Sequence, residues 1–219
     1  MILFHTTKYG EGSLILHGYS EDKGRSSYIL RGVAKKNKSS KISGLHPLCL
    51  LKLDIMDGDR SRSSLKVIKD FSADPILHSI RSDIYKSSIS MFISELLYRS
   101  LTEDIADAVL YNFIKESIVN LERLDSCYAN YHLYFLVQLS GILGFRPTTG
   151  FEGEYDPFTE AEIDILNTMT NLGLAECMAL PLRGDRRLEF VRSMIKYFEF
   201  HLGVRLNIKS LDVLSQILN

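Results

Sequence analysis

The chain has 219 residues, of which 45% are hydrophobic and 24% charged, and its formal net charge is −1. This length allows one large domain or two modest ones, each able to bury its own core. No run approaches the ~18 consecutive apolar residues of a membrane span, and the N-terminus lacks the features of a secretory leader. We therefore expect a globular, cytoplasmic protein with no membrane partner.

The small net charge hides an uneven distribution. Residues 1–71 hold 13 Lys and Arg against 7 Asp and Glu, a net charge of +6, whereas residues 72–219 hold 13 against 20, a net charge of −7. Only the first part is suited to a polyanion, so this division predicts two domains with different partners.

Five short segments with strand character fill the first part and are separated by turns rich in Gly, Asp and Ser: 2–7, 13–19, 26–33, 49–56 and 64–71. The count suits a five-stranded Greek-key barrel of the OB type, although a small sandwich or an SH3-like barrel would give a similar pattern. Tyr9, Tyr19 and Tyr28 could stack on bases, but each is more typical of a residue that packs the barrel.

After Asp74-Pro75 the apolar period becomes helical. The pattern predicts a long helix over 76–101, a second helix opened by Thr102, an apolar central helix over 126–143, a helix capped by Thr159, another from Gly184 to Gly203, and a short last helix after Lys209. We therefore expect an α+β protein: an OB-type barrel at 1–74, followed by a helical bundle domain at 75–219.

A basic tract separates the third and fourth expected strands. Between Asp22 and Asp54 there is no acidic residue. Within eleven positions the tract carries five cations: Arg31, Lys35, Lys36, Lys38 and Lys41. Cations held between two strands suit an extended polyanion, because each can displace a condensed counterion from a phosphate. The alternative is a lysine-rich loop that only aids solubility.

A second, smaller basic group lies late in the chain and consists of Arg183, Arg186, Arg187 and Arg192. This group could extend a DNA path, or it could only balance the acidic tract at 152–164. The alternative for the acidic tract is a metal site, but the tract has no His, Cys or EF-hand spacing, so a solvated acidic surface is the favoured interpretation.

The sequence carries no recognisable catalytic motif. It lacks a phosphate-binding loop with Lys-Ser/Thr, a Gly-x-Ser-x-Gly and a His-Glu-x-x-His. Its six histidines are scattered, and Cys49, Cys127 and Cys177 have no zinc-like spacing, so we expect these cysteines to be small core residues. The pattern indicates no enzyme, no cofactor and no metal.

Several short motifs, in order along almost the whole chain, resemble the RecO family of bacterial recombination mediators. They are Lys-Tyr-Gly-Glu-Gly-Ser-Leu-Ile-Leu at 8–16, Arg-Gly-Val-Ala-Lys-Lys at 31–36, Ser-Gly-Leu-His-Pro-Leu at 43–48, Phe-Ile-Ser-Glu-Leu-Leu at 92–97 and Leu-Gly-Phe-Arg-Pro at 143–147.

The resemblance implies an OB barrel followed by a helical domain, in a nucleoid-associated protein of DNA repair. It implies binding to single- and double-stranded DNA, annealing of complementary strands, and recombinase loading with RecR onto strands covered by single-strand-binding protein. By position, it assigns DNA contact to Arg31, Lys35, Lys36, Lys38 and Lys41, with Arg25 as a neighbour.

The sequence departs from the family at two places. Many members carry four zinc-binding cysteines where this chain has 148–157 without cysteine, so zinc should be absent. Some members place an arginine pair, which receives the acidic tail of the single-strand-binding protein, where this chain has His132, Leu133 and Tyr134. Another cation such as Arg99 or Arg123 would have to substitute. The alternative function is a non-enzymatic adaptor whose barrel binds protein rather than DNA.

Overall fold

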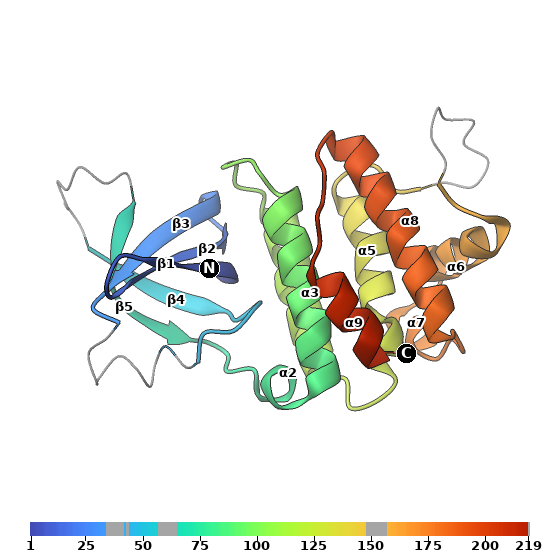
Figure 1. Ribbon diagram of the computed structural model, residues 1–219, viewed down its shortest axis with the longest axis horizontal. Coiled ribbons are helices and arrows are strands. Elements are labelled where there is room, and N and C mark those ends of the chain that lie inside the picture. Colours follow the sequence, from blue (N-terminus) through green and yellow to red (C-terminus); the bar gives the residue numbers. More distant parts are fainter. Residues whose placement is uncertain (34–41, 43, 57–64, 148–156, 219) are drawn as a thin grey trace.

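The computed structural model describes residues 1–33, 42, 44–56, 65–147 and 157–218. A small β-barrel lies at one end and a group of helices at the other, with α3 between them (Figure 1). The strands are β1 (Ile2–Tyr9), β2 (Ser13–Ser20), β3 (Gly24–Arg31), β4 (Leu51–Ile55) and β5 (Lys66–Ala73). The helices are α2 (His78–Ser82), α3 (Ile84–Ser100), α4 (Ala108–Arg123), the 3-10 turn η1 (Tyr128–Asn130), α5 (Tyr131–Ile142), α6 (Glu160–Asn171), α7 (Leu174–Met178), α8 (Gly184–Leu202) and α9 (Ser210–Leu218).

The five strands form one sheet in the order β1-β2-β3-β5-β4, in which β3 and β5 are parallel and the other neighbours antiparallel. The two sheet edges approach each other: Leu3 N donates to Cys49 O at 3.0 Å and Leu51 N donates to Met1 O at 2.8 Å. This partial closure of five strands is the OB arrangement, so the predicted barrel and the α+β class are confirmed. Its interior is filled by Leu3, Leu16, Tyr28, Leu30, Cys49, Leu51, Ile68 and Phe71.

Most of the expected helices are present. α5 is buried on nearly every side, as its uniformly apolar sequence predicts. Thr159 and Glu162 form the predicted capping box of α6, and Gly203 ends α8 at φ +65°. The run at 76–101 is two helices rather than one, because the Asp83 carboxylate accepts hydrogen bonds from the first N–H groups of α3 and so begins a new helix. α7 was not predicted.

The prediction that Thr102 opens a helix is wrong. α4 begins at Ala108, and Asp107 is its cap, accepting hydrogen bonds from Val109 N and Leu110 N. The preceding segment lies against the barrel, where the Tyr19 hydroxyl donates to Ile105 O and accepts from Asp107 N, both at 3.1 Å. These tertiary hydrogen bonds to the backbone take the place of a further helical turn.

The barrel and the helices share a hydrophobic core across α3. Ile2, Phe4 and Tyr19 of the barrel belong to the same buried cluster as Phe92 and Ile93 of α3. The proposed boundary between 1–74 and 75–219 falls between β5 and α2 and stays a prediction. Within the described residues, no helix is both long enough and apolar enough to cross a bilayer.

The cysteines divide into two groups. Cys49 and Cys177 are buried, as expected, whereas Cys127 is exposed, so its assignment to the core is wrong. Cys127 lies in the turn between α4 and η1, with a left-handed backbone conformation at φ +57°.

Candidate nucleic-acid interface

The basic tract connects β3 to β4, and its first cation, Arg31, is exposed at the end of β3. The start of the tract is fixed to the turn between β1 and β2, because Gly32 N and Val33 N both donate to Gly12 O, at 2.9 and 3.0 Å. The other four predicted DNA-binding cations, Lys35, Lys36, Lys38 and Lys41, lie outside the described residues.

The tract is also fixed where it returns to the barrel. Ile42 and Leu45 pack against the barrel core, and Leu45 N donates to Ile42 O at 2.9 Å. Leu48 N then donates to Leu3 O at 2.8 Å. The lysine-bearing residues 34–41 are therefore flanked on both sides by backbone attached to one rigid barrel.

Arg25 binds protein groups at the interface between the barrel and α3. Its guanidinium donates to Tyr98 O at 2.5 Å and to Leu101 O at 2.6 Å, and it lies 4.3 Å from the centre of the Tyr98 ring. These carbonyls end α3, where a cation is favoured. Burial lowers the pKa of Arg25. The DNA contact assigned to Arg25 by resemblance stays a prediction, while the structure gives it a role in attaching α3.

Of the three tyrosines considered for base stacking, two are buried. Tyr19 is 2% and Tyr28 4% exposed, which confirms that both pack the fold. Tyr9, at the end of β1, is 55% exposed. Among these three, only Tyr9 could offer its ring to a base without unfolding.

The structure also brings together a group of rings that sequence reasoning missed. The His5 ring lies 5.0 Å from Tyr98 and 6.1 Å from His17, and the His17 and Tyr98 rings are 5.6 Å apart. His17 is hydrogen-bonded to Thr7 and Ser27, at 3.1 and 2.8 Å. Burial lowers the pKa of His17, and the nearby His5 and Arg25 lower it further, so the fold favours the neutral form of this ring. Pairing of β1 with β2 could have suggested the two histidines, but not Tyr98.

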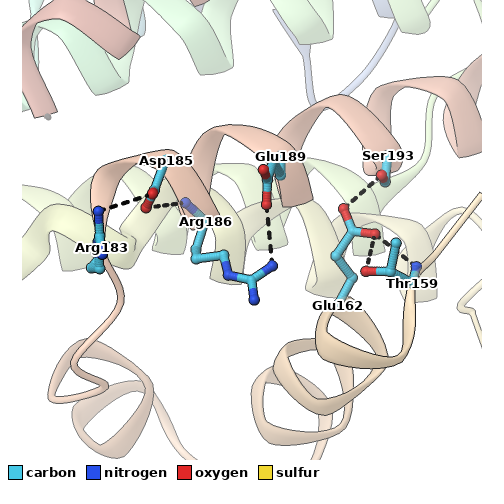
Figure 2. Close-up of polar contacts among 7 residues, drawn as sticks. All are labelled: Thr159, Glu162, Arg183, Asp185, Arg186, Glu189 and Ser193. Carbon is cyan, nitrogen blue, oxygen red and sulfur yellow. Dashed lines mark hydrogen bonds and ion pairs between the residues drawn. The ribbon is translucent and has the colours of Figure 1, made fainter.

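Three arginines of the second basic group bind other protein groups, and Figure 2 shows two of them, Arg183 and Arg186. Arg183 lies 3.2 Å from Asp185, and Arg186 lies 3.3 Å from Glu189, in exposed ion pairs. Arg187 donates to the carbonyls of Leu182 and Leu218 and so attaches the end of α9 to α8. DNA contact by Arg183, Arg186 and Arg187 stays a prediction.

In the described part of the acidic tract, Glu162 is a structural residue. It is 5% exposed and binds the N-cap residue Thr159 and the Ser193 hydroxyl of α8, as Figure 2 shows. Burial alone would raise the pKa of Glu162, but these hydrogen bonds outweigh it and hold the pKa below its usual range. Among the described residues, no group of three or more His, Cys, Asp or Glu is placed to hold a metal ion.

A cation that the sequence analysis did not connect with the start of the central helix, Arg187, lies beside His132. His132 is fully buried and lines a small groove with Arg187 and Leu214, between α5, α8 and α9. Burial, followed by the charge of Arg187, lowers the pKa of His132 to about 3. Arg99 instead pairs with Glu95 at 3.0 Å. Sequence reasoning missed Arg187 here because it lies 55 positions from His132.

Comparison with known proteins agrees with this architecture. Residues 1–73 match the family described as Recombination protein O N terminal, and residues 81–152 match Recombination protein O C terminal. The protein named DNA repair protein RecO of Flavobacterium psychrophilum is 28% identical over 232 residues, covering 99% of this chain and 96% of that protein. The protein of the same name from Porphyromonas gingivalis is 28% identical over 236 residues, with the same coverage. The chain, with its OB-type barrel and attached helices, belongs to the RecO family.

Proposed function

We propose that this protein is a non-enzymatic DNA-binding mediator of repair and recombination. It binds single- and double-stranded DNA through the basic tract, anneals complementary strands, and with RecR assists recombinase loading onto strands covered by single-strand-binding protein. The carrying observation is a tract of five cations attached at both ends to an OB barrel, in a chain of the RecO family.

The physical basis is charge neutralisation. Each Lys or Arg that contacts a phosphate releases a condensed counterion, so the affinity depends steeply on salt. Annealing requires two strands to approach with their bases exposed, and neutralised phosphates permit this approach. We expect annealing without nucleotide or metal; an obligate requirement for either would count against the proposal.

The first experiment is a fluorescence-anisotropy titration of a labelled single-stranded oligonucleotide at several salt concentrations. If about five cations each neutralise a phosphate, log K falls with log salt at a slope of about −3.5, from ~0.7 per contact on single strands. The adaptor alternative predicts little or no DNA binding at ~50 mM salt. If the tract binds phosphates, its affinity for DNA is still high at this salt concentration.

A double variant, Lys35→Glu with Lys36→Glu, tests the tract directly. We expect weaker binding and a flatter salt slope, with an unchanged circular-dichroism spectrum. A matched control is Lys66→Glu with Lys69→Glu, which reverses two charges on β5. If the first double variant keeps the affinity and slope of the unaltered protein, the tract is not the DNA-binding element.

The partners are tested separately from DNA. Purified RecR and single-strand-binding protein are each mixed with the chain, and complexes are measured by sedimentation velocity. We expect a complex with each; deletion of the acidic tail of the single-strand-binding protein removes the second complex if that tail is what docks. Absence of both complexes would restrict the proposed function to DNA binding and annealing.

A further inference from the structure

A cavity of about 270 Å³ lies where β1 meets α3 and the start of α9. Its wall includes His5, Pro47, Met91, Tyr98 and Arg99. A volume of this size is close to the lower end of small-ligand pockets, roughly 300 Å³. It is therefore large enough for one planar ring system.

Two rings, those of His5 and Tyr98, line this cavity. His5 is exposed, and its ring lies 5.0 Å from Tyr98 and 6.1 Å from His17. Arg25 lies over Tyr98, so the group extends from a fixed guanidinium through Tyr98 to the exposed imidazole of His5. A further ring placed against His5 would lengthen this series of contacts. Stacking on aromatic side chains is how proteins hold the bases of single strands without reading their sequence.

The one acidic side chain of the described cavity wall does not oppose an incoming strand. Glu95 lies 3.0 Å from Arg99, and its other oxygen accepts hydrogen bonds from Ser210 N and Oγ, at 2.8 and 2.7 Å. Burial alone would raise the pKa of Glu95, but these contacts outweigh it and keep its pKa low, so the charge is compensated within the wall.

The wall of the cavity follows the basic tract closely in the sequence. The tract begins at Arg31, at the end of β3, and Pro47, six residues after its last cation Lys41, lines the cavity together with His5. This continuity favours single-stranded nucleic acid over a free small molecule as the occupant.

We propose that the cavity between β1 and α3 is a base-stacking site for single-stranded DNA, in which the exposed His5 ring, supported by His17 and Tyr98, receives one unpaired base. This inference rests on the proposed function and adds to it the place where the strand leaves the basic tract. Bases within a duplex are stacked on each other, so the site discriminates single-stranded from double-stranded DNA.

The test uses the full chain with His5→Ala and three labelled probes: oligothymidylate of about 16 nucleotides, the upper end of an OB-fold site, the same backbone without bases, and a duplex of equal length. We expect the variant to bind oligothymidylate about five-fold or more weakly, the effect of one lost base contact. Its affinity for the abasic strand and the duplex, and its salt slope, stay those of the unaltered protein, because no phosphate contact is removed.

Two variants serve as controls. His5→Phe keeps a ring at this position of the cavity wall and retains binding to oligothymidylate. His78→Ala, which removes an exposed imidazole at the start of α2, has no effect. If His5→Ala binds oligothymidylate as the unaltered protein does while Lys35→Glu with Lys36→Glu binds weakly, the stacking site is wrong and the proposed function stands. If the unaltered protein binds none of the three probes at ~50 mM salt, the proposed function fails and the stacking site with it.

Discussion

Replacement of Arg25 by methionine tests which of two roles this residue has, attachment of α3 to the barrel or contact with DNA. The guanidinium makes two charge-assisted hydrogen bonds, to Tyr98 O and Leu101 O, and a cation–π contact with Tyr98. Hydrogen bonds to charged groups contribute about 1.5–3 kcal/mol each, and the ring contact about 0.5–2 kcal/mol. Part of this is offset by the cost of desolvating the guanidinium. We therefore expect Arg25→Met to lower the free energy of unfolding by about 2–4 kcal/mol.

Urea unfolding followed by circular dichroism measures this loss. With a slope near 3 kcal/mol per molar urea, typical of the upper range for small proteins, the midpoint moves down by about 1 M. The control is Arg31→Met, at the exposed far end of β3, for which we expect a much smaller shift. In the DNA titrations we expect the reverse, with the larger effect at Arg31. Arg31→Met reduces the salt slope by ~0.7, and Arg25→Met leaves the slope unchanged. Unchanged stability of Arg25→Met together with a reduced slope would refute the structural role.

Three further variants test the contacts between the barrel and the helices, and the buried helix α5. Tyr19→Phe removes two hydrogen bonds to the 101–107 segment and should cost about 1–3 kcal/mol in urea unfolding; no change would mean that the segment does not depend on them. Gly24→Ala should destabilise more than Gly10→Ala, because both glycines have positive φ but only at Gly24 would a Cβ lie 2.2 Å from Ile105 O; equal melting temperatures would contradict this. His132 has a pKa of about 3 in the folded state, against about 6.5 in the unfolded chain. Below pH 6.5 the unfolded chain therefore binds a proton that the folded protein does not. The free energy of unfolding falls as the pH drops, by about 2 kcal/mol at pH 5. His132→Leu should remove that part of the pH dependence, and an equally steep decline in the variant would disprove it.

Local sequence pattern was sufficient for most of the elements. Segments with strand character, bounded by turns rich in Gly, Asp and Ser, placed all five strands to within a few residues. The capping box at Thr159 and the glycine at Gly203 placed two helix ends. These signals work because the groups that satisfy the backbone lie within a few residues of it. Asp83 was an available signal of the same kind, and it explains why the run at 76–101 divides.

Features fixed by distant residues could not be predicted in this way. The segment before α4 has a good helix-start sequence at Thr102, but the Tyr19 hydroxyl, 86 residues from Ile105, holds it against the barrel. Arg25 looked like one more cation near the basic tract, yet its partners lie 73 and 76 residues away. In the first case the long-range hydrogen bond outweighed a local helix preference, and in the second it gave Arg25 a structural role that its place in the sequence did not indicate.

The proposed stacking site predicts that the attachment of the helices to the barrel also affects DNA binding. Arg25, Tyr19 and Ser94, whose hydroxyl donates to Phe4 O at 2.6 Å, attach the helices to one face of the barrel. Phe4 and Pro47 line the same cavity as Tyr98 of α3, so this attachment holds the two sides of the cavity together. A substitution that removes one of these contacts should thus weaken binding to unpaired bases more than it weakens binding to phosphates. The two effects separate in the salt slope, which depends on phosphate contacts alone.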